Sequence, residues 1–188
     1  PQPVLPSNWV IDWRRFFDFG VPEDKPRFEL NKARRIDPLL TPKLHRLPGE
    51  DPNQRDAVLP FRNLRRGVMM QLPSGQAIAR RMGIAPLTLD EIRQGADGAM
   101  AVTQGLAVET PLWYYVLKEA EARAGGQHLG PVGATIVAEV LVGIVQGSSA
   151  AYLSAQPAFK PSLGPTPGQF TMADLLTFAN AVNPLGDG

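Results

Sequence analysis

The chain has 188 residues, a length typical of one domain, and 44% of them are hydrophobic, enough to form a core. Its 19 basic and 18 acidic side chains leave a net charge of +1, which argues against a dedicated nucleic-acid surface. The chain has no cysteine, which excludes disulfides, thiolate metal sites and a cysteine nucleophile. This leaves the compartment open, since large secreted domains can do without disulfides. Two histidines are too few for a zinc site with three histidine ligands.

The N-terminal third contains two predicted helices separated by irregular chain. Ser7 is expected to cap the first, whose apolar face has spacings i, i+4, i+7 and i+8 and consists of Trp9, Trp13, Phe16 and Phe17. Prolines and charges make residues 20–38 a connector, and a short helix follows Pro42. No signal peptide is visible, and a chain that begins Pro-Gln-Pro-Val is expected to be cut from a longer one.

Clear start and stop signals mark the helices of the middle segment. Residues 64–70 are predicted to be helical, with Pro73 as the stop signal. Ser74 is expected to cap a helix that runs through Met82 and is closed by Gly83. Thr88 begins a T-x-x-E capping box ahead of another short helix.

Three further helices are predicted in the last eighty residues. Thr110 at the N-cap and Pro111 at the first position begin a helix to about residue 124, with Glu119 and Arg123 forming an ion pair away from its apolar face. Residues 131–147 are apolar nearly all round, which favours a buried central helix, and their apolar run is shorter than the ~20 residues needed to span a membrane. Thr171 is expected to cap the last helix.

These patterns predict an all-α fold of about seven helices joined by long proline-rich loops, because no alternating run typical of a strand occurs. Residues 1–188 are expected to form one unit. This much loop is unusual for a self-contained bundle and suits a piece that wraps around a larger body.

Few residues outside one short segment suggest chemistry. His45 and His128 have no companion at ligand or catalytic spacing, so both are interpreted as surface or capping residues, with haem-iron ligation as the alternative. The serines lack a nucleophile elbow, and no phosphate-binding glycine motif occurs. Glu139, alone in an apolar helix, is expected to be buried and paired with Arg80 or Arg81, with a substrate-channel acid as the alternative.

The exception is the segment 59–67, which places three arginines and one asparagine within two helical turns. Asn63 and Arg66 are three residues apart, so on a helix they share a face. An asparagine carbonyl accepts a hydrogen bond from an imidazole N–H, and an arginine binds a carboxylate or phosphate. This face could hold an anionic cofactor and orient a histidine ligand; the alternative is a solvated basic helix.

The order of motifs in the chain resembles the animal-type haem peroxidases, in particular their bacterial members, a superfamily that includes myeloperoxidase, peroxinectin and the cyclooxygenases. The resemblance covers nearly the whole chain. Its main motifs are Leu59-Pro60-x-x-Asn63-Leu64-x-Arg66-Gly67, Leu72-Pro73-Ser74-Gly75-Gln76, Trp9-x-x-Asp12-Trp13-x-x-Phe16-Phe17, Thr110-Pro111-Leu112-Trp113-Tyr114-Tyr115, Leu129-Gly130-Pro131-Val132-Gly133 and Phe170-Thr171-Met172-Ala173-Asp174-Leu175-Leu176. Family members often continue with R-D-H-G where this chain has Gly67-Val68-Met69-Met70.

The resemblance implies a haem-binding role for two residues and assigns no catalytic residue to this chain. Asn63 would hydrogen-bond the far nitrogen of the proximal histidine, and Arg66 would lie at the haem edge, near a propionate. The distal histidine, the distal arginine and the proximal histidine of the family have no counterpart here. The chain therefore resembles the C-terminal part of a larger, mainly helical peroxidase domain whose upstream segment supplies the iron ligand.

Three functions follow as hypotheses. The first is the C-terminal part of a haem peroxidase that reduces peroxide and oxidises an organic or halide substrate, with haem as cofactor and the N-terminal peroxidase segment or chain as partner. The second is a non-catalytic helical binding module derived from that fold. The third is a small haem protein that uses His45 or His128 as its ligand.

Overall fold

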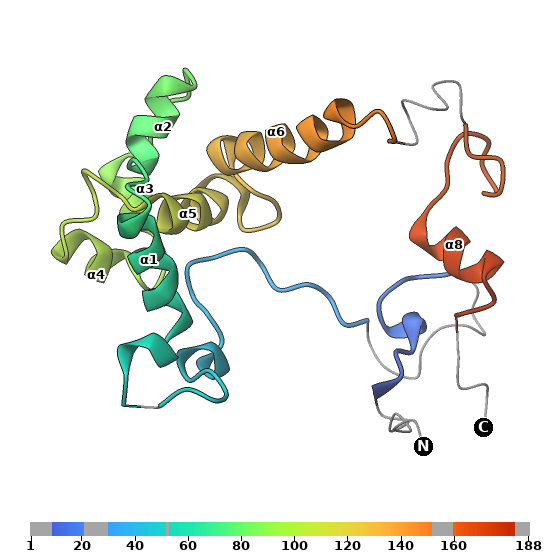
Figure 1. Ribbon diagram of the computed structural model, residues 1–188, viewed down its shortest axis with the longest axis horizontal. Coiled ribbons are helices and arrows are strands. Elements are labelled where there is room, and N and C mark those ends of the chain that lie inside the picture. Colours follow the sequence, from blue (N-terminus) through green and yellow to red (C-terminus); the bar gives the residue numbers. More distant parts are fainter. Residues whose placement is uncertain (1–8, 21–29, 52, 152–159, 183–188) are drawn as a thin grey trace. The chain divides into compact units, whose positions relative to one another are not determined.

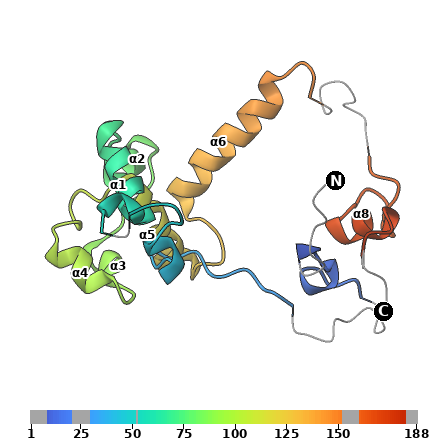
Figure 2. The ribbon, with the colours of Figure 1, turned by 60° about the horizontal axis from the view of Figure 1, so that its bottom comes forward.

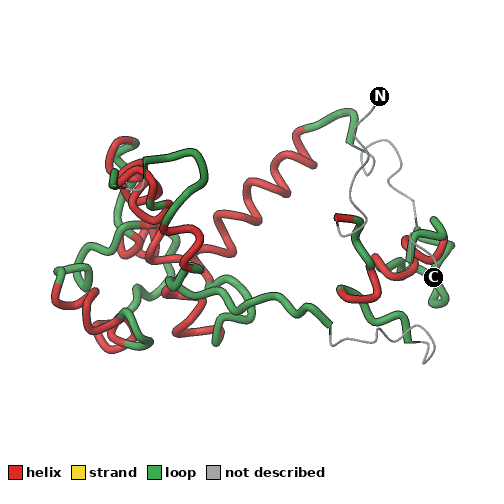
Figure 3. Tube along the Cα trace, turned by 90° about the horizontal axis from the view of Figure 1, so that it is seen from below, coloured by secondary structure: helices red, strands yellow, loops and turns green. Residues whose placement is uncertain are grey.

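The computed structural model describes residues 9–20, 30–51, 53–151 and 160–182. Over these residues it contains seven α helices and no strand, which confirms the all-α prediction (Figures 1 and 3). The chain divides into two units, one formed by residues 1–34 and 148–188 and the other by residues 35–147. None of the described helices is long and apolar enough to cross a membrane.

The unit 35–147 contains six α helices preceded by two 3-10 turns. These elements are η4 (Pro42–His45), η5 (Arg55–Ala57), α1 (Leu59–Met69), α2 (Gly75–Arg81), α3 (Leu89–Arg93), α4 (Gly98–Thr103), α5 (Leu112–Ala124) and α6 (Pro131–Gly147). Helix α5 is the centre of the packing, because α1, α2, α3 and α6 all contact it (Figures 1 and 2).

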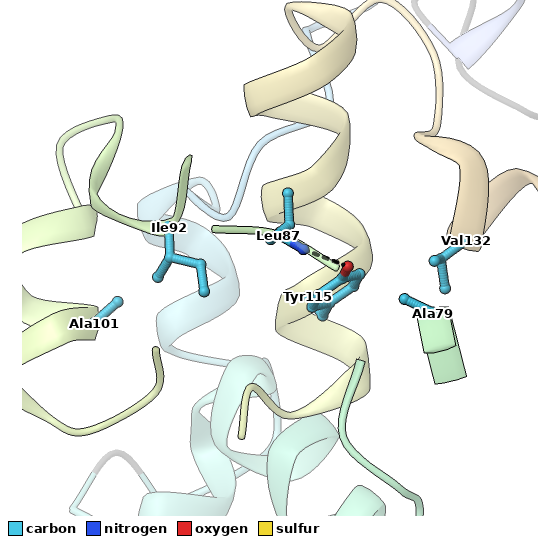
Figure 4. Close-up of a cluster of buried hydrophobic side chains, with 6 residues drawn as sticks. All are labelled: Ala79, Leu87, Ile92, Ala101, Tyr115 and Val132. Carbon is cyan, nitrogen blue, oxygen red and sulfur yellow. Dashed lines mark hydrogen bonds between the residues drawn. The ribbon is translucent and has the colours of Figure 1, made fainter. Parts of the chain in front are cut away.

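The core lies where these helices meet α5. It is a small cluster of buried side chains, namely Ala79, Leu87, Ile92, Ala101, Tyr115 and Val132 (Figure 4). The hydroxyl of Tyr115 accepts a hydrogen bond from the backbone N–H of Leu87 at 2.9 Å, so the only polar atom of this side chain is satisfied. Helix α2 begins against the same ring, since a Cβ at Gly75 would lie 1.9 Å from Cγ of Tyr115.

Most of the predicted helix boundaries are confirmed. The side chain of Ser74 caps α2, Gly83 follows it with a φ of +72°, and Thr88 forms the full capping box of α3. Helix α1 begins earlier than the sequence indicates, at Leu59, because Pro60 fits the first turn of a helix.

Thr110 does not cap α5, and that prediction was wrong. The N-cap is Pro111, and the side chain of Thr110 is turned into the protein instead. Its hydroxyl donates to the backbone oxygen of Leu106 at 2.5 Å and accepts from Nε2 of Gln76 at 2.7 Å. A tertiary network has replaced the local cap because it satisfies a buried hydroxyl.

Helix α6 has the predicted bounds, but the prediction that it is buried was wrong. Only its first turn is buried, at Val132 and Gly133. From Val137 onward the side chains are exposed, with values for the large apolar ones from 42% at Val145 to 64% at Ile144. The side chains are exposed because the helix continues away from α5 and α2 after its N-terminal end (Figures 1 and 2).

The other unit contains the 3-10 turn η2 (Trp13–Arg15) and helix α8 (Met172–Phe178). Thr171 caps α8 through a complete capping box with Asp174, as predicted. The helix predicted over residues 9–17 is wrong, because these residues form no α helix. Its expected cap, Ser7, lies outside the described residues. Asp12 begins a single 3-10 turn there, in which the ring of Trp13 packs against Phe16 and Phe17.

The predicted helix after Pro42 is a single 3-10 turn, η4, which the side chain of Thr41 caps. Leu44 lies in this turn and Leu47 lies after it. Four residues form only one tight turn, which is too short for the helix predicted after Pro42.

Candidate functional site

The two residues singled out in the sequence, Asn63 and Arg66, lie one turn apart on α1. Asn63 is half-buried and Arg66 is exposed. Neither side chain has a hydrogen bond or ion pair to any other residue that the structure describes. Both functional groups are therefore available to a ligand, the amide as donor and acceptor and the guanidinium as a charged donor.

The other two arginines of the segment are engaged by the loop that precedes α1. Arg62 forms an ion pair with Glu50, and Nη1 of Arg65 lies 3.0 Å from Oδ1 of Asp56. These carboxylates neutralise two of the three positive charges on the helix. Arg66 is the arginine of α1 that retains an uncompensated charge among the described residues, so its guanidinium is the one on this helix available to an anionic group.

Two grooves flank Asn63. The larger, of about 570 Å³, is also lined by Arg66 and by the apolar side chains of Leu59, Met69 and Met70. The paired Arg62, Arg65 and Asp56 complete its lining. The smaller, of about 200 Å³, lies between α1 and the start of α5 and is lined by Val68 and Trp113 among others. Asn63 borders both grooves and so occupies a position from which a side-chain amide could contact two bound groups.

The histidines lie outside both grooves. His45 and His128 are exposed, and Nδ1 of His128 is 2.8 Å from the backbone oxygen of Leu129. The described residues contain no cluster of three or more histidine, aspartate or glutamate side chains that could hold a metal ion. These positions agree with the interpretation of both histidines as surface or capping residues.

The expectation for Glu139 was wrong. It is exposed on α6 rather than buried, and it forms no ion pair with Arg80 or Arg81, which are themselves exposed at the end of α2. The reason is the exposure of α6 itself: a glutamate on a helix surrounded by solvent needs no buried partner.

Sequence reasoning missed the buried charge cluster that joins α5 to the loop after α3. The side chain of Lys118 is fully buried, and its ammonium donates to Oδ1 of Asp97 at 2.8 Å, to Oε2 of Glu121 at 2.6 Å and to the backbone oxygen of Gln94. Tyr114 donates to the other oxygen of Asp97. The i, i+3 spacing of Lys118 and Glu121 was the only sequence signal, and it is typical of exposed helix faces.

A second cluster surrounds Arg123. Its guanidinium binds both oxygens of Glu91, at 2.7 and 3.2 Å, and the backbone oxygens of Ala85 and Pro86 at 2.9 and 3.0 Å. The predicted ion pair with Glu119 exists but is long, at 3.8 Å. Glu119 was expected on an exposed face, and it is fully buried. Arg123 therefore stabilises the junction of α3 and α5 mainly through Glu91.

The Arg123–Glu91 pair makes one part of the stability pH-dependent. The hydrogen bond from Arg123 lowers the pKa of Glu91 from 4.5 to about 2. Because the pKa is depressed in the folded state, this stabilisation is fully present above pH 4.5 and is lost as the pH falls toward 2.

The substitution Glu91→Gln tests this pair, since glutamine retains the capping box. We expect it to lower the free energy of unfolding on the order of 2 kcal/mol at pH 7, and the difference from wild type to shrink toward zero near pH 2. Urea unfolding of both proteins between pH 7 and pH 2 measures this difference in unfolding free energy. Asp90→Asn is the control, because Asp90 forms an exposed pair with Arg93. A difference that is independent of pH would contradict the assignment.

Comparisons with protein-family models, with curated proteins and with solved structures find no match to this chain.

Proposed function

We propose that this chain is the C-terminal part of a haem-dependent peroxidase and that it acts together with an upstream segment that supplies the iron ligand. One observation carries the proposal. On the same turn of α1, the amide of Asn63 and the guanidinium of Arg66 have no partner among the described residues, while the neighbouring Arg62 and Arg65 are paired. The N-x-x-R spacing that carries the family resemblance thus falls on the two side chains that remain available.

The residues of the larger groove fit the chemistry of a haem. A haem presents a large apolar face and two carboxylates at its edge, and the lining of the groove combines the apolar Leu59, Met69 and Met70 with the uncompensated charge of Arg66. Arg66 would bind a propionate, and Asn63 would accept a hydrogen bond from the ring N–H of a histidine that binds the iron. When bound, the haem supplies the redox chemistry that reduces peroxide and oxidises an organic or halide substrate.

The exposed apolar side chains that line the two grooves support the presence of a partner segment. Val68, Met69, Met70 and Leu72 are all more than half exposed at the end of α1. Such a group of neighbouring apolar side chains marks a surface that another part of a protein covers. The proposed partner is the N-terminal peroxidase segment or chain.

The experiment uses the complete protein, or this chain expressed together with its upstream segment, and measures the Soret band during haem titration. We expect a Soret band whose position shifts in Asn63→Ala, with haem affinity or peroxidase activity lowered by about 10- to 100-fold, as is typical when a partner of a metal-bound histidine is removed. Arg66→Gln should weaken haem binding by about tenfold through the loss of a charge-assisted hydrogen bond.

Arg80→Gln is the matched control. Arg80 is an exposed arginine on α2 that lines neither groove. A Soret band that is the same in Asn63→Ala and in wild type would show that the motif is wrongly assigned.

The exposure of α6 favours a second candidate, a non-catalytic helical binding module derived from the same fold. Its apolar surface of Val137, Val140, Leu141, Ile144 and Val145 would then be the partner-binding surface. The same titration separates the two functions. A complete protein that never shows a Soret band would exclude the peroxidase and leave the binding module.

A further inference from the structure

The smaller groove beside Asn63, between α1 and the start of α5, has the size of a site for a single side chain. Its volume is about 200 Å³, which is below the roughly 300–1,000 Å³ of sites that hold drug-sized ligands. Leu64, Val68, Leu72 and Leu112 contribute to its apolar lining. The groove therefore suits a small group that is carried on an apolar stem.

The charge of this groove is opposite to that of the larger one. Among the described residues that line it, Glu109 is the one that carries a charge, and none is basic. Glu109 is exposed, and its carboxylate has no hydrogen bond or ion pair with any residue that the structure describes. The larger groove is lined by three arginines, of which Arg66 keeps its charge uncompensated. A cation is therefore attracted to the smaller groove and repelled from the larger one.

The helix ends at the groove do not reverse this sign. Helices α2 and α5 begin there and α1 ends there, so that two partial positive charges and one partial negative charge of about half a unit meet. The side chain of Ser74 already caps α2. The sum of these partial charges, about +0.5, is smaller than the full negative charge of Glu109. The groove keeps a negative potential.

The remaining side chains favour a guanidinium over an ammonium group. The indole of Trp113 lines the groove and is partly exposed, and a planar guanidinium stacks on such a ring. The groove also offers hydrogen-bond acceptors on Glu109, Asn63 and Ser74. A guanidinium carries five N–H donors in one plane, so it can use several acceptors while it covers the ring.

We propose that the smaller groove is a docking site for an arginine side chain that a partner protein segment presents. The guanidinium stacks on Trp113 and pairs with Glu109. A protein segment rather than a free small molecule is the occupant, because Val68 and Leu72 at the groove are 78% and 51% exposed, and apolar residues beside the arginine would cover them. Neither Arg66 nor a haem takes part in this contact, so it forms whether or not the chain binds haem.

NMR titration of the full chain, followed at the indole N–H of Trp113, tests the proposal. The probes are a blocked leucine–arginine–leucine tripeptide, the same tripeptide with citrulline, which is the neutral isostere of arginine, and methylguanidinium chloride. We expect the arginine peptide to bind about 3- to 10-fold more tightly than the citrulline peptide, because only arginine forms a charged pair with Glu109. Methylguanidinium should bind more weakly than the arginine peptide, because it lacks the leucines.

Two variants assign the contact to its residues. Glu109→Gln should abolish the preference for arginine over citrulline, and Trp113→Leu, followed at the backbone amide of Val68, should weaken the arginine peptide by about 2- to 5-fold. Glu139→Gln is the matched control, because Glu139 is an exposed glutamate on α6 that does not line the groove.

Three results would overturn the proposal. The first is equal binding of the arginine and citrulline peptides to the wild type. The second is a preference for arginine that survives in Glu109→Gln or is lost in Glu139→Gln. The third is methylguanidinium binding as tightly as the arginine peptide, which would assign the groove to a free small cation instead of a protein segment.

Discussion

The substitution Lys118→Met is expected to lower the free energy of unfolding by about 3 kcal/mol. Methionine fills a similar volume but removes the ammonium that joins Asp97, Glu121 and the backbone oxygen of Gln94. The two carboxylates then keep their charges in a region where they are mostly shielded from water, since only 17% and 23% of their side chains are exposed. Breaking a buried pair by removing one partner is costly because the remaining charge stays uncompensated.

Thermal unfolding followed by circular dichroism measures this effect. For a chain of this size, 3 kcal/mol corresponds to a fall in Tm of roughly 6–12 °C. Arg93→Met is the control, because it removes a cation from an ion pair with Asp90 in which both side chains are more than half exposed. Such a pair contributes about 0–1 kcal/mol, so its Tm should hardly change. Equal losses in the two variants would contradict a special role for the buried cluster.

The second large effect is expected for Gly75→Ala, which should destabilise the protein by about 3 kcal/mol or more. The added Cβ would lie 1.9 Å from Cγ and 2.2 Å from Cδ2 of Tyr115. The ring cannot move aside easily, because it is fully buried and its hydroxyl binds the backbone of Leu87. Either α2 or α5 must shift, and the core cluster between them is disrupted.

Gly67→Ala is the matched control in the neighbouring helix. The nearest atom to its added Cβ is Cδ1 of Leu72 at 3.9 Å, an ordinary contact. Since glycine in a helix interior is less favourable than alanine, this variant should gain about 0.5–1 kcal/mol. Urea unfolding of both variants separates the two cases. A tolerated alanine at position 75 would mean that α2 does not pack on Tyr115 as described.

Local rules account for the helix boundaries that the sequence predicted. Ser74, Thr88 and Thr171 cap their helices because a hydroxyl two or three residues from a free amide can reach it in any protein. The availability of Asn63 and Arg66 was only partly predictable. Their shared face follows from helical spacing. The neutralisation of Arg62 and Arg65, which leaves Arg66 as the available arginine, depends on the path of the preceding loop.

The wrong predictions for Thr110, Glu119 and α6 have a common physical cause, which is that burial depends on neighbours distant in sequence. Thr110 has good capping chemistry, yet Gln76 and Leu106 offer its hydroxyl partners inside the protein. Glu119 and Arg123 have the spacing of an exposed pair, yet the start of α6 covers the carboxylate. Spacing along one helix cannot distinguish a solvated face from one that another helix covers.

The all-α class, most helix ends and the shared face of Asn63 and Arg66 could be predicted from the sequence, because they follow from backbone hydrogen bonding and helical periodicity within a few residues. Which charges are buried and which apolar side chains are exposed depends on how the helices pack. Lys118 and Glu119 are buried because α5 lies at the centre of its unit, and Val137 to Val145 are exposed because α6 extends away from α5 and α2 after its first two turns. Burial is a property of how helices pack against one another, and no local pattern contains that information.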